Sequence, residues 1–284
     1  MGEHRELAMD QHYKGTDYAF HCNHDLFNER IRIEHYSGNV KHVIAHVLRL
    51  FTDDYSKCIV KVKEGDFSTF ISMGFSYEGT INRYFSGVDM HVMTKYKQSW
   101  RRNAKRWEEE EKIIDGVFAK TPSPLSEKPN MRRASEKDAE KLSTLYKKVF
   151  DVYPTPMDQP EYIRKVMKEG TIFYLVEDDK KITSAASAEV NRTFQNAEIT
   201  DCATLPDSRK GGTMRHLIHA LESTLLEEEI YYAYSIARSL SFGMNAVFCQ
   251  LGYEYGGRLT NNVKIYSDWE DMNLWSKSLG VSAE

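Results

Sequence analysis

The sequence predicts an α/β protein built on a mixed, mostly antiparallel and twisted sheet that is flanked by helices. Two observations support this fold class. From Met131 onward, the hydrophobic periodicity gives the order β-α-α-β-β-β-α-β-α-β-β, which fits a mixed sheet with helices on both faces. In addition, the first 118 residues repeat the order strand–helix–strand–helix–strand–strand that is found near the end of the chain.

In the N-terminal part, the first 27 residues are polar and aromatic and show little periodicity. Ile31, Ile33 and His35 then alternate with polar residues, which predicts a strand. Asn39 is the expected N-cap of the helix that follows. The remaining expected elements are this helix at 40–50, a strand at 57–62, a short helix at 67–73 and two extended segments at 77–85 and 89–96.

The repeat is anchored by two glycine-bounded segments, 74–79 (GFSYEG) and 252–257 (GYEYGG), whose end glycines are in register. Further upstream, 30–35, 40–50 and 57–62 correspond to 197–204, 215–228 and 231–237. Between the first copy's strand and helix stand only residues 36–39 (YSGN), with no basic residue and no second glycine. The N-terminal copy is therefore expected to be a packing, dimerisation or lid partner, and an unrelated α/β cap is the alternative.

A charge-dense helix is expected over 99–118, with Glu108 to Glu111 on a solvated face. Residues 119–130 (AKTPSPLSEKPN) contain three prolines and no periodicity, which is typical of a linker. The expected organisation is thus a degenerate α/β domain at 1–118, a linker at 119–130 and a second domain at 131–284.

The second domain is expected to begin with a strand at 131–134 and the capping signature Ser135-x-x-Asp138. Pro154 and Pro156 make the next segment rigid and hold Tyr153 in a defined direction. The elements expected in this domain are helices at 139–150, 162–167 and 215–228 and strands at 171–177, 181–191, 197–204 and 231–237.

A short basic turn, Arg209-Lys210-Gly211-Gly212-Thr213, joins the strand at 197–204 to the helix that follows. The first N–H groups of a helix have no intrahelical partner, and the helix dipole adds partial positive charge there. Glycine allows the backbone to approach an anion closely. The turn therefore predicts a pyrophosphate site, although its glycine spacing fits neither a P-loop nor a Rossmann turn.

The segment from Arg209 to Met214 resembles the acetyl-CoA motif of the GNAT acetyltransferases, Arg/Gln-x-x-Gly-x-Gly/Ala, with Met214 where a small residue is usual. The resemblance implies a GNAT fold with an N-terminal degenerate GNAT-like half domain. It also implies acetyl-CoA as cosubstrate, no metal, and a central strand that splays from its neighbour. Phe248 stands where the family usually has a tyrosine. The cofactor-binding residues expected from the resemblance are Ala203, Thr204, Leu205, Arg209, Lys210, Gly211, Gly212, Thr213, Met214, Ser241, Asn245 and Phe248.

Acetyl transfer to an amine needs a group that removes the ammonium proton. The run Ala-Glu-Ile-x-x-Cys-Ala at 197–203 resembles the strand of histone-type GNATs whose glutamate is the general base. This resemblance assigns the role to Glu198, with Asp201 as the alternative base or as a binder of the acceptor amine. In a regular strand the two side chains point to opposite faces, and a bulge could bring them closer.

A wider set of motifs resembles the β-lysine N-acetyltransferases over nearly the whole chain. The motifs lie at 153–156, 201–206, 235–238, 243–245, 252–262 and 270–275. The resemblance implies transfer of acetyl to the terminal N6 amine of β-lysine, which gives the compatible solute N6-acetyl-β-lysine. The substrate-binding residues expected near this pocket are Tyr153, Arg258, Asn261 and Asn262. The alternatives are a GNAT enzyme for another small amine or a protein lysine, and a non-catalytic acetyl-CoA-binding sensor.

Composition argues against several other classes of protein. The net charge of −4 gives no electrostatic reason to expect a nucleic acid or an anionic membrane as partner. No apolar run approaches the roughly 18 residues of a spanning helix. The four cysteines are scattered, and the cluster His21-Cys22-Asn23-His24 has no second pair at metal-ligand spacing. The chain is expected to be a cytoplasmic enzyme for a small amine, with dimer formation left open.

Overall fold

A computed structural model describes residues 8–121, 123–125, 127–150, 155–209, 211–265 and 268–280. The N-terminal half contains β1 (Met9–Lys14), β2 (Tyr18–Asp25), β3 (Arg30–Gly38), α1 (Val40–Leu50), β4 (Lys57–Lys63), the 3₁₀ helix η1 (Glu64–Asp66), α2 (Phe67–Ser72), β5 (Ser76–Phe85), β6 (Val88–Tyr96), α3 (Ser99–Arg102) and α4 (Trp107–Phe118). The C-terminal half contains β7 (Met131–Arg133), η2 (Glu136–Asp138), α5 (Ala139–Val149), α6 (Pro160–Lys168), β8 (Ile172–Asp178), β9 (Lys181–Asn191), β10 (Asn196–Thr204), η3 (Pro206–Ser208), α7 (Thr213–Glu227), β11 (Tyr232–Arg238), α8 (Phe242–Gln250), β12 (Glu254–Ile265) and β13 (Asp268–Ser278).

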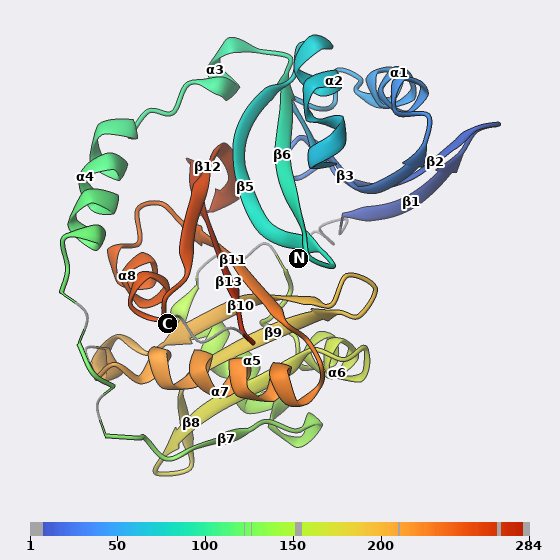
Figure 1. The fold of residues 1–284 in the computed structure, drawn as a ribbon. Coiled ribbons are helices and arrows are strands. Elements are labelled where there is room, and N and C mark those ends of the chain that lie inside the picture. Colours follow the sequence, from blue (N-terminus) through green and yellow to red (C-terminus); the bar gives the residue numbers. More distant parts are fainter. Residues whose placement is uncertain are drawn as a thin grey trace, which may run out of the picture.

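Among the described residues, thirteen strands form one sheet in the order β1-β2-β3-β4-β6-β5-β12-β13-β11-β10-β9-β8-β7. Only β3 with β4 and β10 with β11 pair in parallel in these strands. The predicted mixed, mostly antiparallel sheet is confirmed. In Figure 1 the two halves meet at β5 and β12, and α3 and α4 run down one side between them.

The hydrophobic core follows this two-part layout. α1 and α2 pack against β2, β3 and β4 in one cluster, while α7 and α8 cover one face of the second half and α5 and α6 lie in a separate cluster with β8 and β9. A further cluster joins the halves. It contains Ile59, Ile81, Tyr84, Phe85, Met90 and Val92 from the first half and Tyr234, Leu259, Val263, Ile265, Met272 and Leu274 from the second.

The predicted internal repeat extends to irregular features of the backbone. In each half, the second-to-last strand, β5 or β12, contains a bulge. The middle residue of the bulge has a positive φ, which is 58° at Arg83 in β5 and 42° at Asn261 in β12. In each half the backbone N–H of that residue donates to an aspartate of the next strand at 2.7 Å, Asp89 in one and Asp271 in the other. A shared bulge held by the same hydrogen bond supports two copies of one fold. The domain boundaries at 118 and 131 stay a prediction.

The N-terminal half adds two strands and differs from two expectations. β1 and β2 lie within the polar first 27 residues, where no element was expected; β1 is the exposed edge strand, whereas β2 is the second strand and buries Phe20 and Cys22. The single helix over 99–118 is broken between α3 and α4. The side-chain amide of Asn261 donates to the carbonyl oxygens of Trp100, Arg101 and Asn103 at 3.2–3.3 Å, which fixes the chain in a turn there. Glu110 is buried rather than solvated, with 3% exposure.

Candidate active site

A cavity of about 1940 Å³ lies between the two halves and follows β10 along its length. Glu198 lies near the start of this strand, and the basic turn follows its end. The cavity therefore has an acceptor end near Glu198 and a cofactor end near the start of α7. Predicted site residues that line it are Glu198, Asp201, Thr204, Arg209, Gly211, Gly212, Thr213, Met214, Ser241, Phe248 and Asn262.

The central strand separates from its neighbour as the resemblance implies. β11 pairs with β10 at Asn196, Ala197 and Glu198 within the described residues, and the two strands diverge beyond this point. The side chain of Ser235 still donates to the carbonyl oxygen of Ile199 at 2.7 Å. The divergence opens a slot between the strands where backbone groups of β10 can face a ligand.

The turn at the cofactor end has the conformation that an anion site needs. Gly212 has φ of 69° and is the N-cap of α7, so the first N–H groups of the helix face the cavity mouth. Arg215, in the first turn of α7, donates to the carbonyl oxygen of Ser123 at 2.6 Å and thus ties the linker to this end. Lys120 of the linker also lines the cavity and adds a cation that the sequence did not indicate. Lys210 lies outside the described residues.

Replacing Gly212 by Val should weaken acetyl-CoA binding about 10- to 100-fold, because a β-branched residue is strained at this positive φ and the loop must shift. Isothermal titration of acetyl-CoA measures the change. Gly170→Val is the matched control, since Gly170 also has a positive φ (107°) but does not line the cavity. Equal affinities of the two variants would contradict the role of the turn.

Five predicted site residues do not line the cavity. The side chains of Ala203 and Leu205 pack in the cluster of α5 and α6, which leaves only their backbone groups for a ligand. The Asn245 side chain donates to the carbonyl oxygens of Arg238 and Ser241 and accepts from Trp275, so it holds α8 to the sheet.

Arg258 and Asn261 also have partners within the protein. Arg258 is 5% exposed, lies over the ring of Trp107 at 4.5 Å and pairs with Glu111 at 3.0 Å. Asn261 binds the turn between α3 and α4, as described above. Both side chains hold neighbouring parts of the protein together and do not line the cavity, and their role in substrate binding stays a prediction. Tyr153 lies outside the described residues.

The bulge that was considered for β10 is present. The pairing of β10 with β9 shifts between Thr200 and Ala203, and Asp201 has φ of 49°. This extra residue lets Glu198 and Asp201 line the same cavity. Asp201 accepts from the hydroxyl of Ser187 at 2.6 Å.

Glu189 is a third carboxylate at this end, and the sequence analysis missed it. It stands directly opposite Glu198 across the antiparallel β9–β10 pair. Like charges in this position repel, so the pair holds a proton more tightly. Burial and the charges of Glu198 and Asp201 raise the pKa of Glu189 to about 8. Burial likewise raises the pKa of Glu198, although Lys61, Tyr234 and Arg32 partly offset the rise.

The pH dependence of kcat/KM should reflect the interaction between the carboxylates of Glu189 and Glu198. A base is active when deprotonated, so kcat/KM should fall as the pH drops through the pKa of Glu198, which burial raises above the ordinary carboxyl value. In Glu189→Gln this acid limb should move to lower pH, because the neighbouring negative charge is gone. Profiles of kcat/KM over about pH 6 to 10 measure the shift. Glu161→Gln, an exposed position outside the cavity, should keep the wild-type limb; an unmoved limb in Glu189→Gln would rule out the coupling.

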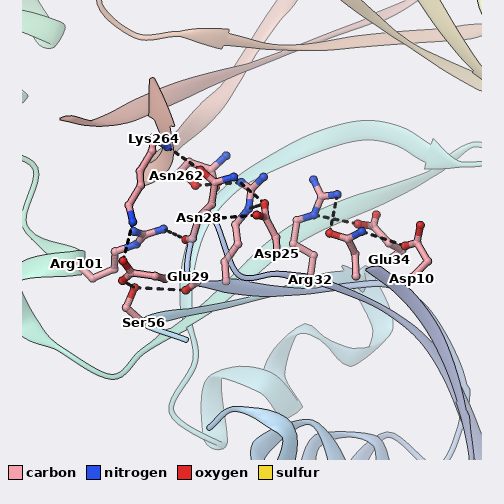
Figure 2. A network of polar contacts seen from close by, with 12 residues as sticks. Asp10, Asp25, Asn28, Glu29, Arg32, Glu34, Ser56, Arg101, Asn262 and Lys264 are labelled. Carbon is pink, nitrogen blue, oxygen red and sulfur yellow. Dashed lines mark hydrogen bonds and ion pairs between the residues drawn. The ribbon is translucent and has the colours of Figure 1, made fainter. Parts of the chain in front are cut away.

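The N-terminal half contributes basic and acidic groups to the acceptor end. Glu34 lies between Lys61, at 2.5 Å, and Arg32, at 3.2 Å, and all three line the cavity. Figure 2 shows Arg32 and Glu34 side by side. Next to them, a second group of contacts joins Asp25 and Asn28 to Lys264 of β12. The hydroxyl of Tyr84 accepts from Lys61 at 2.9 Å. The sequence analysis named no residue of this half as part of the site.

Comparison with known proteins agrees with this geometry. A family model described as the acetyltransferase (GNAT) family matches residues 139–253. The chain is 40% identical to the N-acetyltransferase YodP of Bacillus subtilis, over 90% of this chain and 95% of that one. It is 35% identical to the β-lysine N6-acetyltransferase of Methanococcus maripaludis, over 88% and 93%, and 36% identical to that of Methanosarcina mazei, over 72% and 85%.

The chain is a GNAT acetyltransferase. It belongs to the same family as the β-lysine N6-acetyltransferases, so the resemblance found in its motifs is confirmed. The acetyltransferase uses acetyl-CoA as cosubstrate. This enzyme activity decides against the alternative of a non-catalytic sensor. No helix in the described part of the acetyltransferase is long and apolar enough to cross a membrane.

Proposed function

We propose that this acetyltransferase moves the acetyl group of acetyl-CoA to the terminal N6 amine of β-lysine. The observation that carries the proposal is the mixed charge of the acceptor end. Glu189, Glu198 and Asp201 come from one half of the chain, whereas Arg32 and Lys61 come from the other. An acceptor with two ammonium groups and one carboxylate needs partners of both signs. Two relatives that match most of the chain bear the name of this activity.

In the proposed reaction, both substrates are bound together and the amine attacks directly. Glu198 removes a proton from the N6 ammonium, and the amine nitrogen then attacks the thioester carbonyl carbon. The C–S bond breaks, an amide bond forms, and CoA leaves as a thiolate that takes up a proton. Backbone groups of β10 beyond Glu198 are suited to hold the acetyl and pantetheine groups in the slot beside β11. The pyrophosphate would be held by the residues of the basic turn that line the cavity, Arg209, Gly211, Gly212 and Thr213.

The other acceptors to consider are another small amine and a protein lysine. Basic side chains inside the acceptor end argue against a polyamine, which carries no anionic group for them to bind. The same end favours an amino acid because an amino acid brings its own carboxylate.

The test measures CoA release by the purified enzyme with acetyl-CoA and β-lysine, α-lysine or spermidine. We expect kcat/KM to be highest for β-lysine, and NMR of the product to place the acetyl group on N6. Equal or higher kcat/KM with spermidine would reject the proposal in favour of a polyamine. A higher value with α-lysine would reject β-lysine but retain an amino acid as acceptor.

Two further features belong to the proposal. The four cysteines are free thiols, which is usual in a reducing compartment, and this supports a cytoplasmic enzyme. The product would be a compatible solute, since acetylation leaves one ammonium and one carboxylate and thus no net charge. A homodimer stays a prediction, and size-exclusion chromatography with light scattering measures it.

A further inference from the structure

The internal repeat relates Arg32 of the first half to Glu198 of the second. In each half, a residue at the start of the first strand of the parallel pair reaches the bulge of the other half. Arg30 of β3 donates to a carbonyl oxygen in the β12 bulge, and Asn196 of β10 donates to one in the β5 bulge. The distances are 3.0 Å from Arg30 Nη1 to the oxygen of Asn262, and 2.6 Å from Asn196 Nδ2 to the oxygen of Tyr84. The residues two positions further along these strands, on the same face, are Arg32 and Glu198.

Arg32 and Glu198 therefore approach one cavity from opposite sides of the junction. Both line it, and the positive charge of Arg32 acts on Glu198. The Arg32 side chain is held on β3 by Glu34 at 3.2 Å and by the side-chain oxygen of Asn23 at 3.3 Å. It remains 35% exposed, and in Figure 2 its terminal amino groups point away from the ribbon of β3. The guanidinium is thus positioned by its neighbours and still open to a ligand.

On the β3–β4 side of the cavity, two basic side chains share one carboxylate. Glu34 is shared between Lys61 and Arg32, so the three side chains comprise two cations and one anion. Arg30 differs, because it is 6% exposed and its guanidinium is bound by Asp25 and by the carbonyl oxygen of Asn262. Removing Arg32 leaves Glu34 paired with Lys61 at 2.5 Å, so the fold does not need Arg32 for charge compensation.

We infer that Arg32 binds the carboxylate of the acceptor and thereby selects amino acids over simple diamines. The inference deepens the proposed function and rests on it. A guanidinium presents paired donors that match a carboxylate, so the contact fixes orientation as well as position. With the carboxylate at Arg32, the distal ammonium extends to Glu198 on the other side of the junction. The degenerate half of the chain would then set the specificity of the catalytic half.

The test compares β-lysine with its decarboxylated analogue, 1,4-diaminopentane, as acceptors for the wild type and for Arg32→Leu. In the wild type, β-lysine should be strongly preferred. In Arg32→Leu, kcat/KM for β-lysine should fall about 10- to 100-fold, as expected for a lost hydrogen bond to a charged group. The value for the diamine should stay unchanged when both enzymes are measured above their acid limbs, where the effect of Arg32 on the pKa of Glu198 no longer alters the rate. Arg49→Leu removes an exposed cation outside the cavity and should keep the wild-type preference. Arg32→Lys, which keeps the charge but not the paired donors, should give an intermediate value.

An equal loss for both acceptors in Arg32→Leu would overturn the inference, as would a wild type that does not discriminate between them. Acetyl-CoA titration checks that the variant is folded. Should it not fold, competition in the wild type decides: 3-aminobutanoate, the carboxylate end of β-lysine, should inhibit competitively, and absence of inhibition overturns the inference. If the wild type prefers α-lysine, β-lysine is rejected as the acceptor but the inference about Arg32 is not. The same comparison is then made between α-lysine and its decarboxylated analogue, 1,5-diaminopentane.

Discussion

Replacing Glu198 by Gln is expected to lower kcat about 100- to 10,000-fold, the usual contribution of a general base. The amide keeps the size of the carboxylate but cannot accept the ammonium proton. Glu198 is suited to this role because burial raises its pKa toward the working range of the enzyme. Steady-state CoA release with saturating acetyl-CoA and acceptor measures the effect.

Asp201→Asn is the matched comparison, since both carboxylates line the cavity on β10. Asp201 already accepts from the Ser187 hydroxyl and is 5% exposed, so it is better placed to shape the bulge than to exchange protons. We expect a smaller loss in Asp201→Asn than in Glu198→Gln. The reverse order would move the base from Glu198 to Asp201. Binding of acetyl-CoA to both variants should match the wild type, because the cofactor end is unchanged.

The C-terminal half of the site could be predicted because its signals are local in the sequence. The strand that contains Glu198 and Asp201, the glycine turn and the start of α7 are consecutive, and their chemistry can be deduced from spacing. Glu189 was also within reach. Once 181–191 and 197–204 are taken as a hairpin, the short loop between them fixes the register that sets Glu189 opposite Glu198.

The contribution of the N-terminal half could not be deduced in this way. Arg32, Glu34 and Lys61 are charged residues on strands, and such a pattern is usually a solvated face. Only the arrangement of the two halves turns this face into a cavity wall. The repeat did hold part of the answer, because the correspondence of 30–35 with 197–204 puts a basic residue near the position of the glutamate. The missing glycine turn predicts that the N-terminal half lacks an anion site at this turn, but it says nothing about the face of the strand.

The partners of Arg258 and Asn261 could not be deduced for a similar reason. Both residues follow the aromatic-glycine segment, and sequence reasoning assigned them to the pocket because polar residues near a site are often functional. In the structure they bind the helices that connect the halves, through Glu111 for Arg258 and through the backbone of α3 for Asn261. The sequence shows four consecutive glutamates at 108–111, but nothing in it indicates which of these glutamates is buried against Arg258. Long-range pairs of this kind are invisible to periodicity.

The junction of the two halves leads to the second large prediction, a loss of stability in Gly256→Ala. At this place β5 and β12 approach closely, with Gly79 paired to Gly257. A methyl group on Gly256 would lie 1.9 Å from the carbonyl oxygen of Thr80, which is backbone and cannot turn away. We expect the free energy of unfolding to fall by about 3 kcal/mol, because the strands must separate to admit the added atom. Urea denaturation followed by circular dichroism measures this change.

Gly65→Ala is the control for Gly256→Ala, because a methyl group on Gly65 meets no atom within 4 Å and should leave stability unchanged. The two variants also test how the site depends on the fold. Arg32 and Glu198 belong to different halves, so a wider junction should lower kcat/KM for the acceptor more than it lowers acetyl-CoA affinity, which depends on the C-terminal half and the linker. Equal losses of both would mean that the halves do not need their close contact for acceptor binding. The glycines at this junction are Gly79, Gly256 and Gly257, and the sequence shows Gly79 and Gly257 as the ends of the repeat. A selective loss would show that acceptor binding depends on the short distance that these glycines allow between the two halves.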